Sequence, residues 1–459
     1  MKIALIGAGS VSFALGALND IVLSEKLKKV GHLEVTLMDI EQENVNRTYH
    51  YASEMFSAFS HPGELSRTTD LEEALTHADF VIVAIEANRY FYWSQDFHIP
   101  RRFGSKQIYG ENGGPGSMFH TLRNLGPMLH IARTMEKICP EAWFINYTNP
   151  EAKLVEAISK LTSIKVVGLC HGLDMGIDQL SSFLDIPASS IGVEGGGLNH
   201  FGFFTKIWDK ETGEDLYPLF HEKEKTANRL AHFDHYALSR TMYRTYGYYP
   251  YPGTNHCGEY VSYAEDFYAG LSLQFRYDPI REKLWQSGSA VPEFVYCASG
   301  TSLDKGLFDD TTKTQEDWAA QAYTFDKHNV SKSNEYAIPI IEAICFDEEI
   351  QINAANMPNK GAIKGLPDDM VVETQAIVNG NGISLKPMEI ELPTAILGTI
   401  NIQGSIHKLL LEAYVEQSKT KLLQAILLDP QAPSYYQACA MIDEMCDLQK
   451  DILPELEWK

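Results

Sequence analysis

The chain has 459 residues, of which 44% are apolar and 22% charged, and 38 Lys and Arg against 61 Asp and Glu give a formal net charge of −23 at pH 7. This composition excludes wholesale disorder, and the acidic balance disfavours nonspecific binding to nucleic acid or to anionic membranes. Seven cysteines are too few for a disulfide framework in so long a chain, which indicates reduced thiols.

No apolar run approaches the ~18 residues that span a bilayer. The N-terminal residues enter a strand at once and lack the pattern of a secretory signal. We therefore expect a soluble, cytoplasmic protein that binds neither membranes nor nucleic acid.

The first half of the chain alternates apolar strand-like runs with helical patterns, which predicts a parallel sheet covered by helices on both faces. Apolar residues at helical spacing predict a helix between the first two strands, and Met128–Cys139 is expected to form another crossover helix. The expected strands are Lys2–Ile6, Glu34–Met38, Phe80–Ile85, Trp143–Asn146 and Lys165–Leu169.

After about residue 195 the sequence becomes rich in Tyr and Phe and loses the strand–helix alternation, whereas Ile402–Leu448 has the pattern of long amphipathic helices. We therefore expect an α/β protein. A Rossmann-type, doubly wound parallel sheet is predicted over residues 1–195, and a mixed α+β domain over residues 196–459.

A glycine-rich turn, Gly7-Ala8-Gly9-Ser10-Val11-Ser12, follows the first expected strand and opens the first helix. Such a turn lets backbone N–H groups and a helix N-terminus face a pyrophosphate. Asp39 ends the second strand, where an acid accepts hydrogen bonds from a ribose diol and favours NAD over NADP. Because Ser12 replaces the third glycine of the usual motif, a tight turn without a ligand stays an alternative.

A second glycine cluster covers Gly110–Gly116. Glycines here would let the backbone approach a ligand closely, although a flexible connection explains them equally well.

Cys170 and His171 lie at the C-terminal end of the last expected strand, the end at which open α/β sheets bind ligands. His200 follows a run of three glycines and Leu198-Asn199. A thiolate and an imidazole brought together would hold a divalent transition ion with open positions for substrate. A buried, inert cysteine is the competing interpretation.

Two further segments carry polar side chains of interest. Asn149, in Asn146-Tyr147-Thr148-Asn149-Pro150, follows another strand at the same edge and would hydrogen-bond a sugar or cap the turn. Tyr260 ends the segment Thr254–Tyr260. A tyrosine near a bound cation has a pKa below its usual ~10 and can act as a base, although a half-buried ring is an equally ordinary role.

Together these motifs resemble the NAD- and divalent-metal-dependent family-four glycoside hydrolases, over most of the chain. Two of the motifs lie in the C-terminal half, at residues 356–361 and 366–367. The motifs that carry the resemblance are Gly7-Ala8-Gly9-Ser10, Leu37-Met38-Asp39, Gly113-Gly114-Pro115-Gly116, Asn146-Tyr147-Thr148-Asn149-Pro150, Gly168-Leu169-Cys170-His171-Gly172, Leu198-Asn199-His200, Asn356-Met357-Pro358-Asn359-Lys360-Gly361 and Leu366-Pro367.

The resemblance implies an exception to glycoside hydrolysis by two carboxylates. In this family, NAD+ removes the hydride from C3 of the sugar, a base removes the C2 proton, the aglycone leaves from C1, water adds, and the hydride returns. NAD is therefore not consumed, and Mn2+ or another divalent metal is the second cofactor.

Residue by residue, Cys170 and His200 match the metal ligands, and Tyr260 best matches the C2 base, with Tyr263 as a nearby competitor. Asn149 matches a sugar-contacting residue, and Gly7, Gly9, Ser10 and Asp39 match the NAD-binding residues. His171 stands where a general acid for the leaving group is expected.

The Cys170-His171 pair resembles members that act on unphosphorylated glycosides, whereas members acting on 6-phosphorylated sugars have Asp or Asn after the cysteine. The His256-x-x-Glu259-Tyr260 string favours the α-galactosidase branch, although Gly172 departs from the Ser or Glu found there. An α-galacturonidase, an α-glucuronidase or an α-glucosidase stays an alternative. For a uronide, a carboxylate would be bound by one of three arginines: Arg89, Arg101 or Arg102.

Two other classes share the predicted cofactor domain. A 2-hydroxyacid dehydrogenase needs a His–Asp pair and an anchoring Arg, and no convincing version of that set occurs in the sequence. A non-catalytic NAD-binding protein would not need Cys170 beside His171. The resemblance also implies a homodimer or homotetramer whose interface lies in the aromatic C-terminal half.

Overall fold

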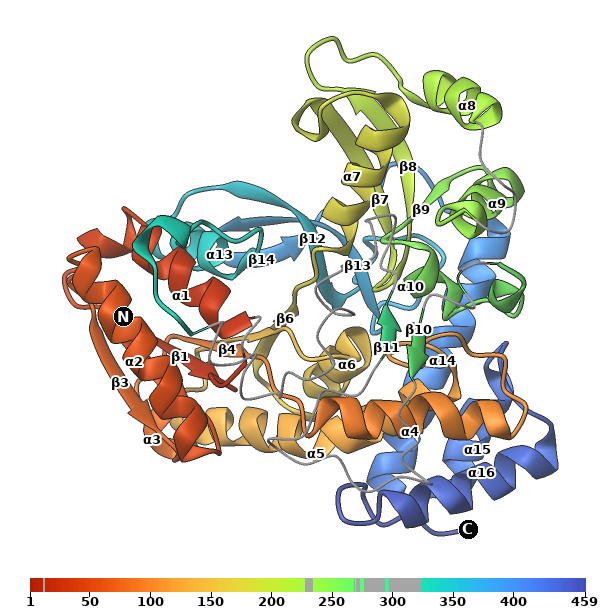
Figure 1. The fold of residues 1–459 in the computed structure, drawn as a ribbon, viewed down its shortest axis with the longest axis horizontal. Helices are drawn as coiled ribbons and strands as arrows, with labels where there is room; N and C mark the ends of the chain where they lie inside the picture. The colour runs from red at the N-terminus through yellow and green to blue at the C-terminus, as the bar shows by residue number, and fades with distance from the viewer. Residues whose placement is uncertain (11–12, 228–233, 268, 270–272, 276–293, 297–322) are drawn as a thin grey trace.

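The computed structural model describes the chain except for residues 11–12, 228–233, 268, 270–272, 276–293 and 297–322. Figure 1 shows the N-terminal strands and helices on the left and the C-terminal helices at the lower right, with the long helix α5 (Gly114–Ile138) running from one group to the other. None of the helices described is both long enough and apolar enough to cross a membrane.

Six parallel strands form one part of a 12-stranded sheet, in the order β3-β2-β1-β4-β5-β6. This is the strand order of a doubly wound dinucleotide-binding sheet, so the predicted fold class is confirmed. The strands are β1 (Lys2–Ile6), β2 (Glu34–Met38), β3 (Glu64–Thr68), β4 (Phe80–Val83), β5 (Trp143–Asn146) and β6 (Lys165–Gly168).

The sequence did not predict β3, because this edge strand is polar and only one of its five residues is buried. The helix predicted over Met128–Cys139 is only the second half of α5. The helix begins at Gly114 and continues through Pro127, a residue that ordinarily predicts a helix end. The other helices of this part are α1 (Phe13–Leu23), α2 (Gln42–Ala58), α3 (Leu71–Leu75), α4 (Arg89–Arg102), α6 (Glu151–Leu161) and α7 (Gly172–Leu184).

The sheet continues beyond β6 with antiparallel strands in the order β12-β13-β7-β8-β9, and β14 pairs with β13. The junction is the pairing of Gly168 on β6 with Asn356 on β12. The border predicted at residue 195 falls inside β7 and stays a prediction. These strands are β7 (Ile191–Leu198), β8 (Phe201–Asp209), β9 (Tyr249–Tyr251), β12 (Ile350–Pro358), β13 (Val371–Asn379) and β14 (Gly382–Leu385), and a separate pair joins β10 (Leu273–Phe275) to β11 (Phe294–Tyr296).

The C-terminal helices pack against the first half of the chain: α14 (Thr394–Glu416) and α15 (Lys419–Leu428) contact α5, and α16 (Tyr435–Leu448) contacts α4. Buried apolar side chains form one continuous core there, which joins Val81 and Phe144 of the sheet to Leu122 of α5 and Leu410 of α14. The remaining helices are α8 (Tyr217–Thr226), α9 (Ala237–Tyr246), α10 (Thr254–Gly258) and α13 (Ala337–Phe346).

Candidate active site

The turn between β1 and α1 is shaped by Gly7 and Gly9. Gly7 has φ +82°, and a Cβ there would lie 2.1 Å from the carbonyl oxygen of Ala84. A Cβ on Gly9 would lie 2.8 Å from Asp39 Oδ2, the oxygen that accepts the Gly9 N–H at 2.9 Å. Both positions therefore require glycine, and the turn leaves a backbone cradle beside the acid that ends β2.

Ser10 completes the described part of this turn: its N–H donates to Gly7 O at 3.0 Å, and its Oγ accepts the N–H of Phe13 at 3.4 Å. The structure thus brings Gly7, Gly9, Ser10 and Asp39 together. Val11 and Ser12, the rest of the predicted motif, lie outside the described residues.

Cys170 lies just beyond β6 in front of a buried polar cluster. Asn199 Nδ2 and Asn356 Nδ2 each donate to Glu373 Oε2 on β13 at 3.0 Å. Burial raises the pKa of the Cys170 thiol well above its ordinary value, and the charges of Glu373 and Glu151 add to this, whereas a hydrogen bond with Asn199 opposes it. A nearby cation would be needed to keep this thiol ionised.

His200 occupies the tight turn between β7 and β8, with a left-handed φ of +66°. Asn199, whose side chain interacts with Cys170, is the chain neighbour of His200. The His200 ring is buried, and it meets the ring of His256 edge-on at a centroid distance of 4.2 Å. Burial lowers the pKa of His200 to about 4, so the imidazole is neutral near pH 7, as a metal ligand must be.

Tyr260 points its hydroxyl into the same region. The OH donates to Asn199 O at 3.1 Å and to Asn112 O at 3.3 Å. Burial and the charge of Glu259 raise the pKa of Tyr260 well above 10, so this hydroxyl would need a nearby cation to ionise. The competing Tyr263 instead pairs with the hydroxyl of Tyr246 at 3.0 Å.

The second glycine cluster is a packed turn and not a flexible connection. The N–H groups of Glu111, Asn112 and Gly113 all donate to Glu259 Oε1, at 2.7, 2.8 and 3.0 Å. A Cβ on Gly113 would lie 2.5 Å from Glu259 O, and a Cβ on Gly116 would lie 2.2 Å from Asp96 O. Gly113 therefore permits close backbone packing against the segment that carries Tyr260, and Gly116 permits it against α4.

His171 precedes the first turn of α7, and its side chain is 47% exposed. Its Nδ1 lies 3.3 Å from Glu335 Oε1. The interaction with Glu335 raises the pKa of His171, with Asp174 contributing further. The raised pKa favours the protonated form of this exposed imidazole, which is the form that protonates a leaving group.

Asn149 follows β5 in a segment fixed by hydrogen bonds. Asn124 Nδ2 donates to Asn149 O at 2.9 Å, Thr148 N–H donates to Asn146 Oδ1 at 2.9 Å, and the Thr148 hydroxyl accepts the Ile85 N–H at 3.0 Å. Asn149 therefore lies beyond the C-terminal end of β5, next to the C-terminal end of β6 that Cys170 follows.

In a comparison with known proteins, residues 2–185 match the model of the family 4 glycosyl hydrolases, and residues 196–432 match the model of their C-terminal domain. The chain belongs to glycosyl hydrolase family 4. It is 30% identical to an α-glucosidase of Erwinia rhapontici, covering 97% of this chain and 96% of that one. It is 29% identical to an α-galactosidase of Bacillus subtilis, covering 99% of both.

An α-galacturonidase of Thermoanaerobacter italicus is also similar, at 25% identity over 99% of this chain and 97% of that one. Among solved structures, a 6-phospho-α-glucosidase from gut microorganisms in complex with NAD and Mn2+ has a TM-score of 0.77 at 24% identity, covering 99% of both chains. The malate dehydrogenase of Cryptosporidium parvum has a TM-score of 0.51 at 14% identity, covering 90% of this chain and 99% of that one, which indicates a shared fold alone.

In this family 4 glycosyl hydrolase, the residues around Cys170 and His200 fit a divalent metal. The Asn199 Oδ1 atom is buried without a hydrogen-bond partner in the part of the chain that is described, beside a thiol and a neutral imidazole. No three His, Cys, Asp or Glu side chains gather as a metal site within the described ranges. The sequence prediction of two protein ligands, with the other positions left to substrate and water, stays a prediction.

Sequence reasoning assigned no role at the site to three buried residues. Glu373, on β13, accepts a hydrogen bond from Asn199, the neighbour of His200. Glu259, in the loop after α10, lies close to His200 itself. Lys153 Nζ donates to Asn112 O, the carbonyl that also accepts the Tyr260 hydroxyl, and burial lowers the pKa of Lys153 to about 8. Each was hidden because its partners are distant in the sequence.

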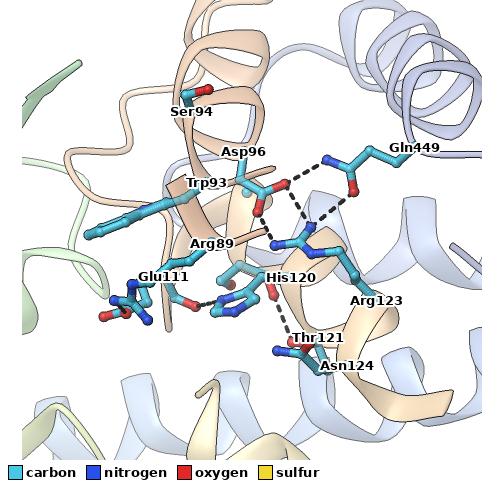
Figure 2. A network of polar contacts seen from close by, with 12 residues as sticks. Arg89, Trp93, Ser94, Asp96, Glu111, His120, Thr121, Arg123, Asn124 and Gln449 are labelled. Carbon is cyan, nitrogen blue, oxygen red and sulfur yellow. Dashed lines mark hydrogen bonds and ion pairs between the residues drawn. The ribbon is translucent and has the colours of Figure 1, made fainter. Parts of the chain in front are cut away.

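Behind the site, a buried ion pair joins α4 to α5. Figure 2 shows Arg123 between Asp96 and Gln449: its Nη2 donates to Asp96 Oδ2 at 2.8 Å, and its Nη1 donates to Gln449 Oε1 at 3.0 Å. Gln449 Nε2 returns a hydrogen bond to Asp96 Oδ1 at 3.0 Å. The same part of α5 carries His120, which pairs with Glu86 at 2.8 Å, and Asn124, so the ion pair supports the site's scaffold.

Replacing Asp96 with Ala is expected to lower the free energy of unfolding by about 3–5 kcal/mol, because Arg123 would remain buried without its counter-charge. Urea unfolding followed by circular dichroism measures this. The control is Glu141→Ala, which removes the exposed ion pair with Lys165 and should have little effect. An equal loss in both variants would contradict the prediction.

Proposed function

We propose that this family 4 glycosyl hydrolase cleaves unphosphorylated α-glycosides, with α-galactosides as the foremost class. The observation that carries the proposal is His171. Next to the candidate metal thiol stands an imidazole held by Glu335, where members acting on 6-phosphorylated sugars have Asp or Asn.

The arginines support a neutral sugar over a uronide. Arg89 forms an ion pair with Glu111, Arg101 Nη1 donates to Gln107 O at 2.7 Å, and Arg102 forms an ion pair with Glu444. Each of the three arginines that the sequence offers for a substrate carboxylate is therefore engaged within the protein.

An α-glucoside is the second candidate substrate, because the α-glucosidase of Erwinia rhapontici is 30% identical over 97% of this chain. Glucosides and galactosides differ in the orientation of one hydroxyl, which a pocket distinguishes by hydrogen bonds. Direct comparison of the two substrates separates these candidates.

NAD, when bound, would accept and return a hydride, and a divalent cation would polarise the sugar. Cys170 and His200 would hold the cation, and the turn at Gly7, Gly9 and Ser10, with Asp39, would hold the NAD. Tyr260 would remove the C2 proton with its phenolate oxygen. Because Glu335 pairs with Nδ1 of His171, the proton on His171 Nε2 would pass to the leaving group.

The test is hydrolysis of nitrophenyl α-galactoside, α-glucoside and α-galacturonide, with NAD+, Mn2+ and reductant omitted in turn. We expect activity only with all three present, highest on a neutral glycoside, and deuterium from D2O at C2 of the released sugar. Activity that persists without NAD+ and Mn2+ would disprove the mechanism.

We further propose a homodimer or homotetramer in a reducing compartment such as the cytoplasm, since Cys170 must stay reduced to bind a metal. Exposed apolar side chains on the C-terminal helices support an interface there, and light scattering measures the assembly. These side chains are Ile402, Val415, Leu427, Leu428, Tyr435 and Tyr436.

A further inference from the structure

Two unpaired polar atoms face one another inside the candidate metal site. His200 Nδ1 and Glu259 Oε2 are 3.6 Å apart. The side chains are 5% and 0% exposed, and within the described residues neither atom has a hydrogen-bond partner. Buried polar atoms are rarely left unpaired in folded proteins, so this pair requires a physical explanation.

The other oxygen of Glu259 is fully committed. Oε1 accepts three successive backbone N–H groups from the glycine turn at residues 111–113. The turn therefore fixes the carboxylate rotamer and directs Oε2 at the imidazole. A small rotation of the His200 ring would bring the two atoms to hydrogen-bond length.

Neighbouring groups do not compete for His200 Nδ1. His256, whose ring is in contact with His200, pairs its own Nδ1 with Asn255 Oδ1 at 2.8 Å. Glu111, the other acid close to His200, forms an ion pair with Arg89. Glu259 is thus the one described carboxylate placed to accept a hydrogen bond from the Nδ1–H group of His200.

We propose that Glu259 is a positioning residue that holds His200 in the tautomer with its proton on Nδ1, so that Nε2 presents its lone pair to the metal. The inference rests on the proposed function, in which His200 is a ligand. A carboxylate behind a ligating histidine fixes the ring and increases the basicity of the ligand nitrogen, and its loss typically weakens metal binding 10–100-fold.

The first test is Glu259→Gln in the full-length protein. The glutamine oxygen can still accept the three N–H groups, but its NH2 group then faces His200 Nδ1 and forces the proton onto Nε2. We expect Mn2+ binding, titrated by electron paramagnetic resonance, to weaken about 10–100-fold, with NAD affinity unchanged. The matched control is Glu156→Gln, in a second buried pair where His407 Nδ1 lies 3.1 Å from Glu156 Oε2. It should leave Mn2+ affinity unchanged.

The second test uses the wild-type protein, and decides alone if Glu259→Gln does not fold. With 15N-labelled histidine and Cd2+ as the metal, NMR should show His200 protonated at Nδ1 and metal-bound at Nε2, with His200→Ala identifying the resonance. Metal bound at Nδ1, or a folded Glu259→Gln variant with wild-type Mn2+ affinity, would overturn this inference. The proposed function would still stand in that case if the wild-type protein is a metal-dependent glycosidase. Absence of Mn2+ binding by the wild type would overturn both.

Discussion

Replacing Cys170 with Ser is expected to reduce Mn2+-dependent glycoside hydrolysis by at least about 100-fold, because a neutral hydroxyl is a far poorer ligand than a thiolate for a divalent transition ion. The fold should survive, since the two side chains are nearly equal in size. The measurement is kcat/KM at saturating Mn2+, together with the affinity for NAD, which should not change.

The control for this variant is Cys446→Ser, which changes a partly buried cysteine on α16. It should keep wild-type activity and the same need for Mn2+. Normal rates in Cys170→Ser would contradict the assignment of Cys170 as a ligand, and equal losses in both variants would indicate a general effect on folding.

Replacing Tyr260 with Phe is expected to lower kcat by about 10²–10⁴-fold, the usual contribution of a positioned base. The change removes only the hydroxyl that donates to Asn199 O and Asn112 O, and the buried ring keeps its packing. Deuterium incorporation at C2 of the sugar should fall with kcat, because both depend on the same proton removal.

Tyr263→Phe is the matched control, since this hydroxyl pairs with Tyr246 and should be dispensable for the reaction. Steady-state rates and mass spectrometry of the released sugar in D2O compare the two variants. Full activity in Tyr260→Phe with a large loss in Tyr263→Phe would show that the two tyrosines have been assigned in the wrong order.

The sequence predicts the central parallel sheet well, because buried strands such as Val81–Val83 and Phe144–Ile145 are continuous apolar runs. It does not predict β3, whose edge position leaves no apolar run to detect. Nor does it predict that β12 joins β6, since antiparallel pairing between segments far apart in the chain leaves no local pattern.

For the site too, the sequence predicts local features and not the contacts between distant segments. Cys170 and Asn149 could be placed at one sheet edge, because the C-terminal ends of parallel strands meet there. The contacts of Glu373 with Asn199, and of Glu259 with the glycine turn, depend on packing between segments more than 140 residues apart. The burial of Tyr260, which raises the pKa of its hydroxyl in the absence of a cation, could not be predicted either, because sequence reveals the neighbouring residue types but not their depth in the fold.

The junction between β6 and β12 has a consequence for biosynthesis. Cys170 leaves the ribosome long before Asn356 and Glu373, and at 5–20 residues per second the roughly 200 residues between them take about 10–40 s to synthesise. During this interval β6 is an open sheet edge and the thiol lacks the polar cluster behind it. The nascent chain can therefore form the glycine turn beside Asp39 first, and the candidate metal-binding region only after β13 has been made.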